Sequence, residues 1–247
     1  MIVKEIQAKS ILSKSQIYNY ALNAYIGCSH KCLYCYARFM KRYTGHSEAW
    51  GDFVDVKTNA PELLAKEVKK KRIGRVWISG VCDAYQPLER KYELTKRCIE
   101  ILVENGWPFT IQTKSPLVVR DLELLKKAPD CEVGFTITTA EDATRKMFEP
   151  YAPPIAKRVE ALSILHRAGI RTFVMIAPML PGALGLVGML KGNVGHVLLD
   201  RLNYHYADWA FKKYGMEWAM DDEFFNQMGE DLSAEFEKAG VSCRKLF

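Results

Sequence analysis

The sequence predicts an α/β fold in the form of a partial (βα)6 barrel. Short apolar runs rich in β-branched residues alternate with longer amphipathic stretches, which is the pattern of parallel strands joined by helices. The chain has 247 residues, of which 49% are hydrophobic, so it can form one sizeable core and falls in the size range of barrel folds. Six strand–helix units can be counted along the chain, and six units form a partial barrel.

The expected strands are short and apolar. They cover residues 23–27, 75–79, 109–113, 132–138, 171–177 and 194–199. The first of them leads into a loop that carries three cysteines. In α/β barrels the chemistry takes place at the carboxyl ends of the strands, so the residues just past each strand are the first candidates for a site.

The expected helices lie between these strands and have helical spacing of apolar residues. They cover residues 60–71, 91–105, 117–127 and 154–168. Asn59 and Pro61 open the first helix, and Gly106 and Gly169 follow the ends of two others. We therefore expect a single domain over residues 1–247, with a core at about 20–200 and a mostly helical extension at about 201–247.

The N-terminus and the cysteines indicate a cytoplasmic protein without a membrane partner. The first residues are too polar for a signal peptide, and no apolar run approaches the ~18 residues of a membrane-spanning helix. The chain has seven cysteines, an odd number, and the four outside the cysteine loop have no paired spacing. This pattern argues against a disulfide framework and for reduced thiols.

Basic residues suggest a nucleic-acid partner without requiring one. The net charge of +6 is modest, and part of it is concentrated in residues 66–75. That stretch can be a nucleic-acid patch or the solvated end of a helix. Residues 204–214 mix aromatic and basic side chains, as in a stacking surface for nucleic acid or in a core helix with a charged outer face. The glycine-rich residues 181–195 match no phosphate-binding motif and predict a mobile loop.

Three cysteines in the loop after the first strand carry the strongest chemical signal. Cys28, Cys32 and Cys35 are separated by three and then two residues. Three thiolates on one short loop can bind three irons of a 4Fe–4S cluster and leave the fourth iron open to a non-protein ligand. Zinc is the alternative, but a structural zinc site usually requires a fourth Cys or His, and His30 inside the loop is a poor fourth ligand.

This spacing, with an aromatic residue before the last cysteine, resembles the signature of the radical S-adenosylmethionine (SAM) superfamily. Residues 23–38 and later landmarks over about residues 20–185 resemble its spore photoproduct lyase-related branch. The landmarks include residues 57–59, 82–87, 112–115, 120–121, 149–150, Arg158, 177–178 and 181–182. The chain is shorter than the lyase, and Cys82 immediately precedes Asp83, so the resemblance extends to the branch rather than to photoproduct repair.

The resemblance implies a radical SAM-type barrel with a 4Fe–4S cluster and SAM as cofactors. The cluster would cleave SAM to a 5′-deoxyadenosyl radical, which abstracts hydrogen from a substrate. An external electron donor such as a flavodoxin or ferredoxin is implied as well. The substrate stays open between nucleic acid, in a DNA photoproduct lyase or a nucleic-acid modification enzyme, and a peptide or small metabolite. A non-catalytic metal-binding scaffold is the alternative of another class.

The resemblance and the strand-end positions together select candidate residues for cofactor binding. They are Tyr34, Tyr36, Ser79, Asp83, Lys114, Thr136, Thr138, Arg158 and Ala177. The two tyrosines would shield the cluster and pack on adenine, while Ala177 would contact adenine through its backbone. The two threonines have a simpler explanation in strand propensity.

Three charged candidates have structural alternatives. The Lys114 ammonium can pair with the SAM carboxylate or lie on the surface. Asp83 can accept from the SAM amino group or ribose, or cap the next helix. Arg158 can bind the cofactor carboxylate or form an ion pair with Glu149.

Cys82 is the candidate catalytic residue. It follows the second expected strand, so its thiol can donate a hydrogen atom to a product radical next to the cofactor. The alternative is a small buried apolar side chain, which is a common role of free cysteine.

Overall fold

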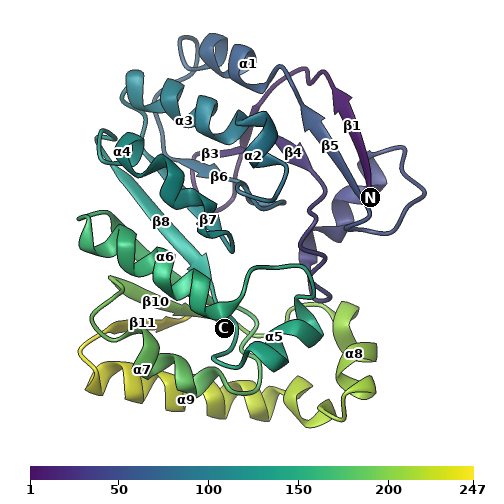
Figure 1. Ribbon diagram of the computed structural model, residues 1–247, viewed down its shortest axis with the longest axis vertical. Helices are drawn as coiled ribbons and strands as arrows, with labels where there is room; N and C mark the ends of the chain where they lie inside the picture. The colour runs from purple at the N-terminus through teal and green to yellow at the C-terminus, as the bar shows by residue number, and fades with distance from the viewer. The chain divides into compact units, whose positions relative to one another are not determined.

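The computed structural model describes residues 1–247, which divide into two compact units (Figure 1). The first unit contains residues 1–30 and 37–133, and the second contains residues 31–36 and 134–247. Both units combine parallel strands with helices. No helix combines the length and the apolar character that a membrane crossing requires.

The first unit contains two small sheets. In one, β3 (Tyr20–Leu22), β6 (Val76–Ile78) and β7 (Phe109–Thr113) are parallel, and β2 (Leu12–Lys14) is antiparallel to β3. In the other, β5 (Phe53–Lys57) pairs parallel with β1 (Ile2–Ile6) and antiparallel with β4 (Tyr25–Ile26). The helices are η1 (Tyr36–Tyr43), which begins at the unit boundary, α1 (Ala60–Glu67), α2 (Glu89–Tyr92), α3 (Leu94–Glu104), η2 (Pro116–Asp121) and α4 (Leu122–Leu125), with α1 and α3 side by side (Figure 1).

The second unit contains the remaining parallel strands. β10 (His196–Leu199) pairs with β9 (Arg171–Ile176) on one side and β11 (Ser242–Lys245) on the other, and β8 (Cys131–Thr136) enters the unit at residue 134. Helix α9 packs against β11 (Figure 1). The helices are α5 (Asp142–Phe148), α6 (Ile155–Arg167), η3 (Ala183–Gly185), α7 (Leu186–Leu190), η4 (His205–Ala207), α8 (Asp208–Lys213), η5 (Glu217–Met220) and α9 (Asp222–Lys238).

The α/β class is confirmed, and β3 with β6 to β10 corresponds to the six expected strands. The first expected strand was misplaced at residues 23–27, because the paired segment of that sheet is Tyr20–Leu22. Residues 25–26 instead form β4, which pairs with β5 in the other sheet. The chain passes from one sheet to the other at Asn23 and Ala24. The sequence does not show that β3 and β4 pair in different sheets, because the residues on both sides of this change are apolar.

Two expectations about loops and helices were wrong in detail. Residues 181–195 are not simply a mobile loop, because η3 and α7 form there and bury Ala183, Leu186 and Leu190. The helix expected at residues 117–127 is a 3-10 turn, η2, followed by the short α4. In residues 181–195 the apolar residues between the glycines pack into the core. The high glycine content did not indicate this packing.

The two basic segments expose their cations, which suits both solvent and a nucleic acid, and Trp209 in the second segment is 52% exposed. Residues 66–75 include the end of α1 and lead to the amino end of β6, with Lys69, Lys70 and Arg72 exposed. The chain therefore carries them at the end of β6 opposite to residues 79–83. In α8, Phe211 is buried while Lys212 and Lys213 are exposed, as in a core helix with a charged outer face.

Candidate active site

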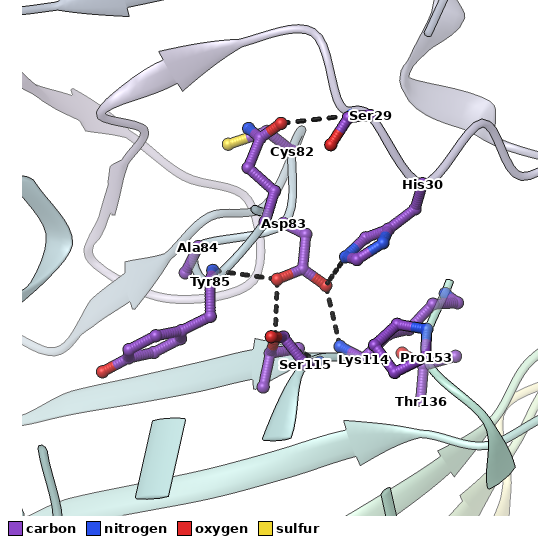
Figure 2. A network of polar contacts seen from close by, with 12 residues as sticks. Ser29, His30, Cys82, Asp83, Ala84, Tyr85, Lys114, Ser115, Thr136 and Pro153 are labelled. Carbon is purple, nitrogen blue, oxygen red and sulfur yellow. Dashed lines mark hydrogen bonds and ion pairs between the residues drawn. The ribbon is translucent and has the colours of Figure 1, made fainter. Parts of the chain in front are cut away.

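In the first unit, candidate residues gather where parallel strands end. Strands β3, β6 and β7 run parallel, so their carboxyl ends meet at one edge of the sheet. The segments that follow them begin at Asn23, Ser79 and Lys114. The first half of the cysteine loop, residues 27–30, contacts the segment after β6 through Asp83 and Gln86 (Figure 2).

Asp83 connects three of these segments through its buried carboxylate. It accepts hydrogen bonds from the backbone N–H of Tyr85 at 2.9 Å, Thr113 Oγ1 at 2.6 Å and the backbone N–H of Lys114 at 2.7 Å, and His30 Nε2 lies 3.4 Å from its Oδ2 (Figure 2). Burial acts to raise the pKa of Asp83, but His30 and these donors outweigh it and hold the pKa well below its usual range. The ionised Asp83 carboxylate therefore connects the segment after β6 to the end of β7 and to the cysteine loop.

The contact with Tyr85 is a local turn rather than a helix cap, since α2 begins only at Glu89. The cap considered from the sequence is therefore not formed. Contact of Asp83 with SAM stays a prediction.

Gln86 holds the backbone on both sides of Cys28. Its fully buried side-chain amide donates to the carbonyl of Gly27 at 3.2 Å and accepts from the N–H of Ser29 at 3.1 Å. Gly27 has φ +91°, and a Cβ there would lie 2.3 Å from the carbonyl oxygen of Phe53, so only glycine fits. The backbone conformation of residues 27–29, at the start of the cysteine loop, is therefore fixed by Gln86 and by the space available at Gly27.

Cys82 lies in a polar corner of the same unit. Its Sγ is 3.5 Å from Ser79 Oγ and 3.9 Å from Asn23 Oδ1. Burial raises the pKa of the Cys82 thiol to about 11, so the thiol keeps its hydrogen at neutral pH. Ser79 adopts φ +66°, an uncommon conformation for a residue with a side chain, and such strain is often found at functional sites.

In the second unit, Glu149 brings together four of the candidates. Its buried carboxylate accepts a hydrogen bond from Tyr34 and one from Thr138 Oγ1 at 3.1 Å, and it pairs with Arg158. The Arg158 guanidinium also donates to the carbonyls of Thr136 at 3.0 Å and of Pro153 at 2.9 Å. Burial and the Glu149 charge raise the pKa of Tyr34 well above its usual value, so the phenol donates its proton to the carboxylate.

The ion pair considered for Arg158 is therefore present, and the side chain is fully buried with it. Thr136 takes part through its carbonyl and Thr138 through its hydroxyl. Tyr36 begins η1 and is 41% exposed, Lys114 gives its N–H to Asp83, and Ala177 directly follows β9. Their contacts with SAM stay predictions.

The three motif cysteines are reduced thiols on one loop that crosses the unit boundary. Cys28 belongs to the first unit, and Cys32 and Cys35 belong to the second. The Cys35 N–H donates to the Cys32 carbonyl at 3.2 Å. Neither unit on its own contains three His, Cys, Asp or Glu side chains grouped as a metal site. The fit to an iron–sulfur cluster therefore rests on the donors themselves, which are three cysteine thiols with no disulfide among them.

Sequence reasoning gave no site role to Gln86, Asn23 or Lys57, and treated His30 only as a poor metal ligand. Gln86 and Lys57 both fall within the family landmarks, and Asn23 directly follows a strand. The available signals were the family landmarks for Gln86 and Lys57 and the position just past a strand end for Asn23.

Comparison with known families settles the class of protein. Residues 22–183 match the family model for the Radical SAM superfamily. The chain belongs to the radical SAM superfamily. Membership implies a 4Fe–4S cluster and SAM, and the matched segment includes parts of both units. The chain is therefore an enzyme of this superfamily, as its cysteine spacing indicated.

Sequence relatives come from archaea, bacteria and a phage. An uncharacterized protein of Methanocaldococcus jannaschii is 36% identical over 216 residues, which cover 85% of this chain and 81% of the relative. One of Mycobacterium tuberculosis is 32% identical over 190 residues, 72% of this chain but only 56% of that protein. The radical SAM Nα-GlyT isomerase of Pseudomonas phage M6 is 24% identical over 215 residues, covering 85% of this chain and 43% of the isomerase.

Solved structures share the fold at low sequence identity. Spore photoproduct lyase in complex with a dinucleoside spore photoproduct has a TM-score of 0.74 and 15% identity, with 99% of this chain and 82% of the lyase covered. SuiB of Streptococcus suis bound to the precursor peptide SuiA has a TM-score of 0.61 and 13% identity, with 92% and 48% covered. These matches confirm the α/β partial-barrel fold.

Proposed function

We propose that Cys28, Cys32 and Cys35 bind the 4Fe–4S cluster, with SAM on the iron that has no protein ligand. The observation that carries this assignment is a loop with three cysteines outside any disulfide in a chain of this superfamily, with the backbone around its first cysteine held by Gln86. When bound, the cluster supplies the electron that cleaves SAM to a 5′-deoxyadenosyl radical. Seven cysteines without a disulfide suit a reducing compartment such as the cytoplasm.

The remaining candidates are assigned to SAM by their positions. Lys114 pairs with the SAM carboxylate, and Ser79 and Asp83 lie in the adjoining segment after β6. Tyr34, Thr136, Thr138 and Arg158, which form the Glu149 network of the second unit, are assigned to SAM as well. Tyr36 and the backbone of Ala177 contact adenine.

Cys82 is proposed as the hydrogen donor to the product radical. Its S–H bond breaks homolytically, the hydrogen atom forms a C–H bond on the product, and a thiyl radical remains on Sγ. One electron and one proton return the thiyl to the thiol, the electron coming from the low-potential carrier that also reduces the cluster, such as a flavodoxin or ferredoxin. A protonated, partly accessible thiol is the form that this step requires.

A nucleobase-containing substrate is the favoured class. The phage relative is named an Nα-GlyT isomerase, and the lyase of similar fold was solved with a dinucleoside photoproduct. The net charge of +6 is compatible with a polyanion. Binding of a DNA oligonucleotide that weakens steeply with salt is the result expected for this class.

The test of the function is SAM cleavage by the reconstituted protein. We would load the chain with iron and sulfide without oxygen, add dithionite and SAM, and measure bound iron and released 5′-deoxyadenosine, with and without a thymidine-containing oligonucleotide. Release, increased by the oligonucleotide, is the expected result. A protein that binds zinc tightly and takes up no iron would contradict the proposal and favour a metal-binding scaffold.

Replacing Gln86 by Ala should weaken cluster binding without unfolding the chain. The variant leaves the Gly27 carbonyl and the Ser29 N–H without their partner and frees the backbone at Cys28. Loss of such supporting contacts typically costs about 10–100-fold in metal affinity. Iron retention after dilution and the visible and EPR spectra of the cluster would measure it.

The matched control is Gln227→Ala, which removes a glutamine from the exposed side of α9. Its iron retention should equal that of the wild type. Equal retention in Gln86→Ala would show that Gln86 does not position the cluster loop.

A further inference from the structure

We propose that Lys57 and Asn23 form an anion-binding subsite beside Cys82, which binds a phosphate or carboxylate group of the substrate. The proposal deepens the function above and rests on it. It assigns a charge to the substrate and places that charge next to the proposed hydrogen donor. We call Lys57 and Asn23 the Lys57 subsite.

The subsite is built where strands of the first unit end. Lys57 is the last residue of β5, and Asn23 directly follows β3. Lys57 Nζ donates to the carbonyl of Asn23 at 2.9 Å, while Asn23 Oδ1 lies 3.9 Å from Cys82 Sγ and accepts from the N–H of Val81 at 3.1 Å. Asn23 therefore contacts both residues, Lys57 through its backbone carbonyl and Cys82 through its side chain.

The Lys57 ammonium is partly buried and forms no ion pair with a carboxylate of the chain. Its ammonium has three N–H donors, and one of them is used by the Asn23 carbonyl. Other buried cations of the chain are paired, as Arg158 is with Glu149 and Arg145 is with Asp142 at 2.9 Å. A partly shielded ammonium with no counter-charge in the chain attracts an anion, so an anion at this position would be favoured.

Two carboxylates of the same unit, Asp83 and Glu89, accept hydrogen bonds from groups other than Lys57. Asp83 accepts from Thr113 and from the backbone of Tyr85 and Lys114, and Glu89 accepts from Tyr25 and from the backbone of Thr95 and Lys96. Burial lowers the pKa of Lys57, and the group that opposes this effect is the Cys82 thiol rather than a carboxylate. An anion from outside the chain can therefore supply the counter-charge that the chain itself does not provide.

A ligand can reach this corner because Lys57, Asn23 and Cys82 are all only partly buried. The Asn23 side chain uses its oxygen for Val81 and Cys82, which leaves its NH2 group as a second donor for the same anion. An ammonium and an amide together match the oxygens of a phosphate or carboxylate. An anion bound there places the attached part of the substrate beside the thiol.

The test compares an anionic and a neutral alkylating reagent at Cys82 in the cluster-loaded, full-length chain. Iodoacetate carries the charge that the subsite binds and iodoacetamide does not, and both need the same thiolate. The ratio of their rates therefore cancels any change in the thiol pKa. Rates at Cys82 would be followed by peptide mass spectrometry without oxygen.

In the wild type we expect the ratio to favour iodoacetate, and Lys57→Met should lower it by about tenfold, the factor that a charge-assisted hydrogen bond of about 1.4 kcal/mol provides. Lys57→Arg should restore part of it. Lys96→Met, a lysine of α3 paired with Glu93, should leave it unchanged. Inorganic phosphate should slow iodoacetate selectively in the wild type and have no such effect in Lys57→Met.

Three results would overturn the proposal. One is the same ratio in wild type and Lys57→Met, and another is no reaction at Cys82 with either reagent. The third is protection by SAM with no effect of phosphate, which would assign the ammonium to the cofactor carboxylate. Because the readout needs no SAM cleavage, a chain that fails to release 5′-deoxyadenosine can still show the expected ratios, so failure of the function and of the subsite are distinguishable.

Discussion

Alanine at Cys28, Cys32 or Cys35 is expected to remove the cluster and with it all SAM cleavage. A 4Fe–4S cluster with three protein ligands has no spare thiolate in this loop, so each loss leaves two thiols that cannot hold it. Bound iron should fall from about four per chain to near zero. Release of 5′-deoxyadenosine should fall to background. Iron analysis, visible spectra and product chromatography on each variant would measure these losses.

The other cysteines provide the matched controls. Cys243 lies in the edge strand β11, and Cys243→Ala should keep both iron and SAM cleavage. Cys82→Ala should keep the iron and the cleavage but lose the product of hydrogen transfer. A motif variant that retains full iron would contradict the ligand assignment, and loss of iron in Cys243→Ala would show that the assay reports folding instead.

Most strands of the larger sheet were predictable because they are short and rich in apolar and β-branched residues. β7 was expected with its observed bounds, and β6, β8, β9 and β10 to within about two residues. β1, β2, β5 and β11 were not expected. Ile2–Ile6 contains Lys4 and Glu5, and Ser242–Lys245 is largely exposed, whereas β5 is buried but is interrupted by Asp55. Edge strands carry charges that prevent further pairing, and those charges remove the apolar pattern that would have revealed them.

The site was predictable only where its chemistry is local in sequence. Three cysteines within eight residues show a metal-binding pattern without a structure. The contacts that hold the loop are long-range, since Gln86 reaches back to Gly27 and Glu149 reaches Tyr34. No spacing rule connects such partners, and only the fold brings them together.

Removing Glu149 should be among the most destabilising single changes in the chain. Glu149→Ala would leave Arg158, which is fully buried, without its counter-charge, and would take the acceptor from Tyr34 and Thr138. Breaking a buried ion pair in this way typically costs about 3–5 kcal/mol of the free energy of unfolding. Urea unfolding followed by circular dichroism would show this loss as a lower midpoint with little change in slope.

Two further variants separate the cost of an unpaired buried charge from the cost of lost packing. In the double variant Glu149→Leu, Arg158→Met no charge is stranded, so it should be more stable than Glu149→Ala although it lacks both charges. Lys157→Ala breaks the exposed pair with Glu160, 2.8 Å apart, and should cost at most about 1 kcal/mol. If Glu149→Ala proved no more costly than Lys157→Ala, the buried network would not stabilise the second unit. Packing alone would then fix the position of Tyr34 within the cysteine loop.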